Sequence, residues 1–437
     1  MSIRIAFDWE NPQAAKGPEL RATWARLTIT INDVPITQVQ DYAVRSVRDG
    51  IYVPLYPLAE WLAMHWWFVF HEYETPGLWR EAEESYARRH NLRYAREGFA
   101  LPNLHICPMG PRICLAWKPV DMPAEKVRFL QEGTALFDTE VVREAFADFI
   151  RVVLKRLEFE GLANTLLEDE WKAIEAVDPE EREFCEASAA LGLDPYSLMD
   201  EHREAIVQAS ETLPAGFASD FFSVANIHDL PKQVKTVING LKQIKNLSGD
   251  LIPLKDLREK TAKIDPLQTP WEEGYVFARK LRKLLGREDD LIKNMQHVST
   301  YLGVDEQDLK QAIISPHDQF RFFDALIDVN EHGSPGFLIE KRQEESRRFA
   351  FFRSLFEYLI SESHAPALIS ATRSERQKRN RAFAAEFLAP AALLKGHMSG
   401  DVLYEEEIDE LAAAFGVSPY VIRHQIENHR LARLIKD

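Results

Sequence analysis

Residues 348–360 of the chain read RFAFFRSLFEYLI. Large apolar side chains recur on nearly every face of the helix that this stretch predicts, which is typical of a helix buried on all sides. Two of its polar residues, Arg353 and Glu357, are four positions apart and would be neighbours on one face. We therefore expect a helix inside a C-terminal domain that brings one cation and one anion to the same side.

A second stretch, residues 380–390, reads NRAFAAEFLAP. Together the two stretches resemble the ImmA/IrrE family of zinc metallopeptidases, in which R-F-T-L-A-H-E-L-G-H-x-L-L precedes E-x-x-A-N-x-F-A-A-x-L-L-x-P. Residues 270–279, PWEEGYVFAR, resemble a segment found upstream of those motifs. The resemblance covers roughly residues 265–437 and implies a zincin-like, mostly α-helical domain.

The metal ligands of that family are absent here. In the intact motif two His bind zinc and the Glu between them acts as general base. The aligned positions hold Arg353 for the first His, Ser354 for the Glu, Glu357 for the second His and Gln377 for the downstream acid. A guanidinium has no lone pair for a metal, and a catalytic zinc needs about three protein ligands. We predict no catalytic residue, no metal and no cofactor, and a vestigial cleft formed by these four residues.

Arg353 and Glu357 also suggest what replaces the metal. We expect a buried ion pair between them, with Gln377 as a further member. The alternative is an exposed helix pair that contributes a few tenths of a kcal/mol. A register shift of two residues would place Glu375 at the acidic position, but it would not restore the two His.

Composition and length indicate a multidomain, soluble cytoplasmic protein. At 437 residues the chain has room for two to four domains, and it is 46% hydrophobic and 28% charged. Three Cys provide no disulfide framework, which is typical of a reducing compartment. The first residues form no apolar signal segment, and the apolar stretch 55–70 is too short and too polar to span a membrane. His105, Cys107 and Cys114 lack a second ligand pair, so we expect buried side chains there and no zinc site.

The net charge of −16 is distributed unevenly. Residues 331–437 hold 15 of the 53 Lys and Arg residues and 16 of the 69 Asp and Glu residues, so nearly all the excess negative charge lies earlier. An acidic chain opposes non-specific binding to nucleic acid. Five basic residues cluster between 373 and 381, and they form either a solvated helix face or a phosphate-binding patch.

The chain predicts an α+β fold in three parts. Residues 1–120 read as a β-rich domain with one buried apolar helix near 57–70, and Asn32-Asp33 is placed as a hairpin turn. Residues 121–264 read as a helical region, with helical periodicity over 141–157. Residues 265–437 form the peptidase-like domain. Its first helix is expected to begin with a Thr269–Glu272 capping box and to end at Gly286.

A short pattern recurs at 191–196, 302–307 and 415–420: a helix, a Gly, an Asp or Ser N-cap and a second helix. This is the chemistry of a helical hairpin or a helix-turn-helix. In the last copy, Arg423 and Gln425 are candidates for contact with base edges. No phosphate-binding loop, dinucleotide fingerprint or nucleophile elbow is present in the sequence.

These observations favour a non-catalytic pseudo-metallopeptidase. We expect a regulatory or scaffolding component that binds a protein or peptide partner, in a bacterial stress-response or phage-defence module. One alternative is an active zinc-dependent peptidase with a rearranged site. Another is a DNA-binding transcriptional regulator that uses the C-terminal helices.

Overall fold

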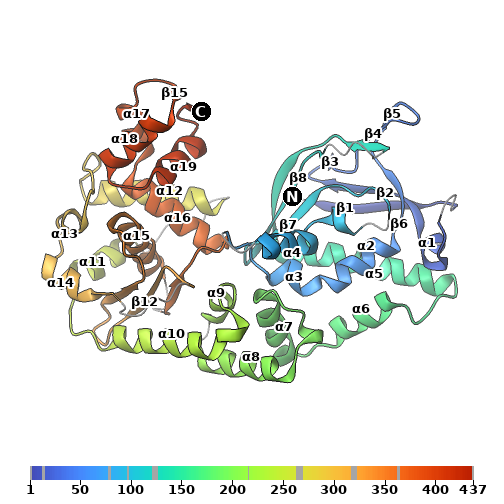
Figure 1. Ribbon diagram of the computed structural model, residues 1–437, viewed down its shortest axis with the longest axis horizontal. Coiled ribbons are helices and arrows are strands. Elements are labelled where there is room, and N and C mark those ends of the chain that lie inside the picture. Colours follow the sequence, from blue (N-terminus) through green and yellow to red (C-terminus); the bar gives the residue numbers. More distant parts are fainter. Residues whose placement is uncertain are drawn as a thin grey trace. The chain divides into compact units, whose positions relative to one another are not determined.

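The computed structural model describes residues 2–11, 15–76, 80–95, 98–120, 126–214, 216–261, 269–315, 322–361 and 365–435 (Figure 1). It is a mixed α+β structure, as predicted. The chain divides into two compact units, Met1–Asp200 and Glu201–Asp437. The segment 121–264, predicted as a helical region of its own, contributes helices to both units. Within the described residues, none of the helices combines the length and apolarity needed to cross a bilayer.

The strands of the first unit form three small antiparallel sheets, with orders β1-β2-β3 (β6 also pairs with β2), β10-β8-β7 and β5-β4-β9. The strands are β1 (Ile3–Trp9), β2 (Trp24–Ile31), β3 (Val34–Pro35), β4 (Val39–Asp41), β5 (Ser46–Arg48), β6 (Ile51–Pro54), β7 (Leu104–Pro108), β8 (Arg112–Trp117), β9 (Val127–Phe129) and β10 (Gly133–Asp138). The predicted turn at Asn32-Asp33 joins β2 to β3, and both residues have positive φ, 46° and 66°.

The prediction of a helical region is wrong for residues 127–138, because strands β9 and β10 lie there. β9 pairs with β4 and β10 pairs with β8. Ala135 and Phe137 are buried at alternate positions, a strand period that the longer helical pattern downstream obscured. Helix begins only at Thr139.

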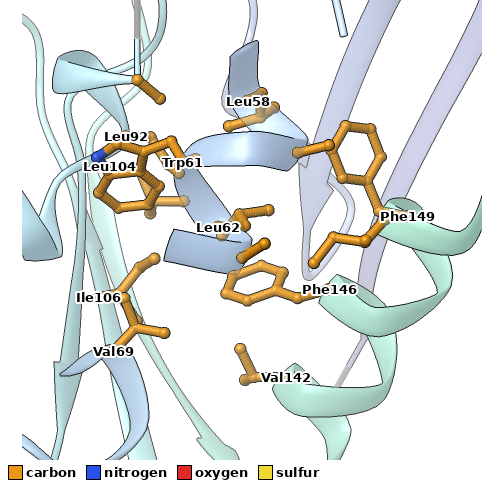
Figure 2. Packing of buried hydrophobic residues seen from close by; sticks show 14 of the residues in the cluster. Leu58, Trp61, Leu62, Val69, Leu92, Leu104, Ile106, Val142, Phe146 and Phe149 are labelled. Atoms are coloured by element: carbon orange, nitrogen blue, oxygen red, sulfur yellow. The ribbon is translucent and has the colours of Figure 1, made fainter. Parts of the chain in front are cut away.

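The helices of the first unit pack against these sheets. They are α1 (Pro18–Ala22), α2 (Tyr56–Met64), α3 (Trp66–His71), α4 (Arg80–His90), α5 (Thr139–Phe159), α6 (Leu166–Ala176) and α7 (Pro179–Ala190). The single helix predicted near 57–70 is broken at His65 into α2 and α3. The core lies where α2, α3, β7 and α5 meet (Figure 2). The periodic apolar positions predicted in α5 are all buried there.

His71, at the end of α3, couples the stability of this unit to pH. Burial, aided by the nearby Arg143 and Arg182 charges, lowers the pKa of His71 to about 3. Its Nε2 lies 3.7 Å from Glu186 Oε1. The unfolded chain takes up this proton near pH 6.5, whereas the folded chain does not. Stability is therefore lost as the pH falls, by about 2 kcal/mol between pH 7 and pH 5.

We expect His71→Gln to remove this part of the acid sensitivity. The measurement is urea unfolding of both proteins at pH 7 and pH 5, followed by Trp fluorescence. Eight of the nine Trp residues lie in the first 200 positions, so the signal reports mainly on this unit. Equal losses in the two proteins between pH 7 and pH 5 would contradict the assignment.

The second unit is built around a four-stranded sheet of order β11-β13-β12-β14, in which β11 runs parallel to β13 and the other pairs are antiparallel. The strands of this unit are β11 (Ile313–Ile314), β12 (Ala325–Val329), β13 (Pro335–Ile339), β14 (Ala367–Ile369), and the separate pair β15 (Val402–Leu403) and β16 (Arg433–Leu434). A turn precedes β13, with Gly333 at φ 73°.

Helices cover this sheet and build the C-terminal core (Figure 1). They are α8 (Asp200–Thr212), α9 (Ala218–Phe222), α10 (Leu230–Lys245), α11 (Ile252–Thr261), α12 (Pro270–Leu284), α13 (Met295–Leu302), α14 (Glu306–Ala312), α15 (Glu344–Ile360), α16 (Glu375–Leu388), α17 (Ala391–His397), α18 (Glu405–Phe415) and α19 (Pro419–His429). Consecutive residues of β13 face different helices. Leu338 meets Gly240 of α10, and Phe337 meets Phe351 of α15.

The structure contains some, but not all, of the helix-capping features that the sequence predicted. α12 begins at Pro270 and ends before Gly286 as predicted, but the Thr269 hydroxyl forms no capping hydrogen bond. The glycines of the three repeated patterns all adopt left-handed φ, 74°, 67° and 67°. The Asp N-caps of the first two copies accept backbone hydrogen bonds, whereas the Ser418 side chain of the third forms none.

Candidate functional site

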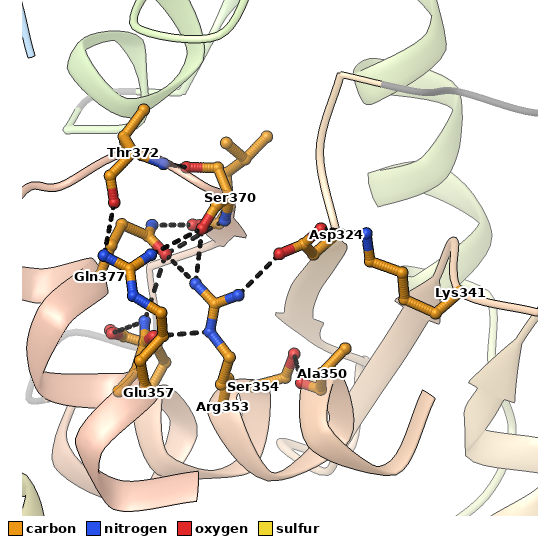
Figure 3. A network of polar contacts seen from close by, with 12 residues as sticks. Asp324, Lys341, Ala350, Arg353, Ser354, Glu357, Ser370, Thr372 and Gln377 are labelled. Carbon is orange, nitrogen blue, oxygen red and sulfur yellow. Dashed lines mark hydrogen bonds and ion pairs between the residues drawn. The ribbon is translucent and has the colours of Figure 1, made fainter. Parts of the chain in front are cut away.

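α15 carries the guanidinium of Arg353 into the interior of the second unit. The residue is 3% exposed. Its Nη1 donates to Asp324 Oδ2 at 2.7 Å and its Nε donates to Asn380 Oδ1 at 2.8 Å. Its Nη2 donates to Ser370 O at 2.6 Å and to Gln377 Oε1 at 2.7 Å (Figure 3). Each guanidinium nitrogen therefore has an acceptor, and the charge has a carboxylate partner, which a buried Arg requires.

Asp324 precedes β12 and forms ion pairs with two basic side chains, one of which is Arg353. Lys341 also forms an ion pair with it. Burial by itself would raise the pKa of the Asp324 carboxyl, but Arg353 and Lys341 outweigh that effect and hold the pKa below its usual value. The carboxylate is therefore ionised and neutralises the buried guanidinium.

Gln377 and Asn380, one turn apart on α16, complete the network. Gln377 Oε1 also accepts from the backbone of Ser370 at 3.1 Å, and its Nε2 donates to Leu368 O at 2.8 Å. Asn380 Nδ2 donates to Glu357 Oε1 at 3.1 Å. Both amides thus orient Arg353, and Asn380 also contacts Glu357.

The expected ion pair between Arg353 and Glu357 does not form. Asn380 lies between them, donating to Glu357 and accepting from Arg353. Glu357 instead lies 3.7 Å from Arg376 Nε, and Arg376 also pairs with Asp220 at 2.8 Å. The helical spacing identified the correct face, but a buried side chain is partnered by whichever tertiary group is nearest. The predicted contact between Arg353 and Gln377 is present.

The four predicted cleft residues separate into different environments. Arg353 borders a large pocket, and Glu357 borders a smaller one of about 230 Å³ that Arg376 also lines. Ser354 is fully buried and donates to Ala350 O, one turn back on its own helix. Gln377 is likewise fully buried. Across the parts of the chain that are described, no three His, Cys, Asp or Glu side chains are grouped to hold a metal ion.

The large pocket measures about 730 Å³ and lies between α12, α15, α16 and α19. Its polar wall contains Asp324 and Glu345 and five basic residues, Lys341, Arg353, Arg373, Lys378 and Arg381. Its apolar wall contains Phe349 and the aromatic rings of Trp271, Tyr275 and Tyr420. A concave site of this size with a few convergent polar groups is typical of ligand-binding pockets.

The residues considered for DNA contact are not arranged to read bases. Gln425 is fully buried, and its Nε2 donates to Glu386 Oε2 and to Ala389 O, both at 2.8 Å. Arg423 pairs with Glu405 on the neighbouring helix. In the basic cluster, Arg376 and Arg379 form ion pairs with Asp220 and Glu273. Two of the five basic residues of this cluster are therefore paired with carboxylates of the fold.

Sequence reasoning missed Asp324, Asn380 and the pocket walls contributed by α12 and α19. Asp324 lies next to a buried strand and carries no motif signal. Asn380 lies in the second quoted stretch, next to the buried apolar residues Ala382 and Phe383, and a polar residue there was an available clue. Comparisons with protein-family models, curated proteins and solved structures find no match to this chain.

Proposed function

We propose that this chain is a non-catalytic, metallopeptidase-like protein that binds a protein or peptide partner. Its role would be regulation or scaffolding in the cytoplasm, in a bacterial stress-response or defence module. The observation that carries the proposal is the buried Arg353 guanidinium. It stands at the first metal-ligand position of the resembled motif, fully hydrogen-bonded and neutralised by Asp324.

The chemistry at that position disfavours a zinc site. A divalent cation would meet a fixed positive charge and amide groups already engaged with one another. Displacing Arg353 would remove one donor from each of Asp324, Gln377 and Asn380. The contact between Arg353 and Gln377 supports the register on which the resemblance rests, because it joins two positions that coordinate one metal in the intact motif.

We expect the purified full-length protein to contain far less than one zinc per chain. Elemental analysis measures this, and a casein digestion with and without chelator tests for peptidase activity. A variant with Arg353→His, Ser354→Glu, Glu357→His and Gln377→Glu should acquire about one zinc per chain. Stoichiometric zinc in the natural protein, or chelator-sensitive cleavage, would favour the alternative of a rearranged peptidase and overturn the proposal.

A further inference from the structure

The pocket between α12, α16 and α19 has an excess of positive charge in a chain whose net charge is −16. Five basic side chains and two acidic ones line it. One of the acidic groups, Asp324, already forms ion pairs with Arg353 and Lys341.

Arg381, on α16, contributes one of the positive charges of this pocket. Its Nη2 donates to Thr372 O at 2.8 Å and its Nη1 to Ser370 O at 3.4 Å, both neutral carbonyls. Among the residues that the structure describes, no carboxylate forms an ion pair with it. Burial, together with the adjacent Arg353 charge, lowers the pKa of Arg381 to about 9. An anion placed beside Arg381 would stabilise the charged form of its guanidinium.

Two further groups in the wall are suited to a polar ligand. The N-terminus of α19 borders the pocket at Ser418, whose side chain does not cap the helix, so the positive end of the helix dipole faces it. Gln425 also lines the pocket. Its Nε2 faces two acceptors, which fixes the orientation of the amide, and its buried Oε1 has no donor within the described structure.

The pocket also has aromatic side chains that are accessible. Trp271 is 39% exposed and Tyr420 is 69% exposed, and both line the pocket. Amphipathic rings of this kind are enriched at protein interfaces, where they provide apolar contact and a polar edge.

We infer that this pocket binds an acidic segment of a partner polypeptide, with a carboxylate on Arg381 and a large apolar side chain against Trp271 and Tyr420. A peptide offers the two features that the walls call for: anionic groups for the basic side chains and apolar side chains for the aromatic rings. A longer polyanion such as nucleic acid would extend beyond the pocket along a chain whose net charge is −16, whereas a short acidic segment need contact only the basic pocket. The inference rests on the proposed function, since it names the chemistry of the partner.

The test uses the full chain and a fluorescein-labelled peptide of alternating Glu and Leu, with a matched peptide of Gln and Leu. Fluorescence anisotropy should show the Glu peptide binding at least about tenfold more tightly. Arg381→Gln should weaken the Glu peptide by about tenfold or more, the effect expected for losing a hydrogen bond to a charged group. Lys283→Gln, an exposed residue of α12 outside the pocket, removes the same charge and should change nothing.

If Arg381→Gln fails to fold, Tyr420→Ser tests the aromatic wall and should weaken both peptides. Equal affinity for the two peptides, or no binding of either, would overturn the inference. So would displacement of the Glu peptide by a short single-stranded DNA at equal concentration. These outcomes leave the zinc and casein measurements untouched, so failure of this inference is distinguishable from failure of the proposed function.

Discussion

Replacing Arg353 by Met should destabilise the second unit by about 3 kcal/mol. Removing one partner of a buried ion pair typically costs about 3–5 kcal/mol, because the other charge is left buried and unpaired. We expect the lower end of that range, since Lys341 still neutralises part of the Asp324 charge. Asn380, Gln377 and the Ser370 carbonyl also each lose one donor. The measurement is urea unfolding followed by circular dichroism.

The matched control is Arg342→Met, an exposed position just before α15. It removes the same charge and should change the unfolding free energy by less than about 0.5 kcal/mol. Asp324→Asn should cost less in the Arg353→Met protein than in the natural one, because the pair has already been broken. Strictly additive effects of the two substitutions would show that the ion pair does not contribute as described.

Much of the C-terminal unit follows from the pattern of apolar residues. The stretch 348–360 predicted a helix buried on all sides, and in α15 the residues from Ala350 to Leu359 are all buried. The same periodicity located the core positions of α5. These predictions succeeded because burial of a helix face depends on spacing along the chain, which the sequence displays directly.

The partner of Arg353 could not be found in that way. The i,i+4 rule predicted Glu357 as the partner. The carboxylate that accepts from Arg353 is instead Asp324, which directly precedes β12 and lies 29 residues earlier. The rule describes neighbours on an exposed helix surface. Inside a core, the groups on other elements compete, and Asn380 and Asp324 are positioned by the packing of α16 and β12. The pocket is invisible in the sequence for the same reason, because its walls come from four helices distributed between Pro270 and His429.

Gly274 of α12 controls how closely that helix approaches α16, and a side chain there should be strongly disruptive. A Cβ at this position would lie 2.4 Å from Arg379 O and 2.8 Å from Phe383 N. Both atoms belong to the backbone of α16, so no rotamer change relieves the collision and the helices must separate. Overpacking costs about 1–3 kcal/mol, and we expect the upper end here. The better helix propensity of Ala offsets about 1 kcal/mol, which leaves a net loss of about 2 kcal/mol for Gly274→Ala.

The larger Gly274→Val should lose more, because it adds volume and a β-branched side chain to the same contact. Gly396→Ala on α17 is the matched control, since no atom lies within 4 Å of a Cβ there. It should be neutral or should stabilise the protein by up to about 1 kcal/mol. Urea unfolding measures all three variants. Because α12 also carries Trp271 and Tyr275 into the pocket wall, Gly274→Ala should weaken binding of the Glu peptide as well. If Gly274→Ala instead matched Gly396→Ala in stability, the close packing of α12 on α16 would have to be abandoned, together with the position of the aromatic wall that depends on it.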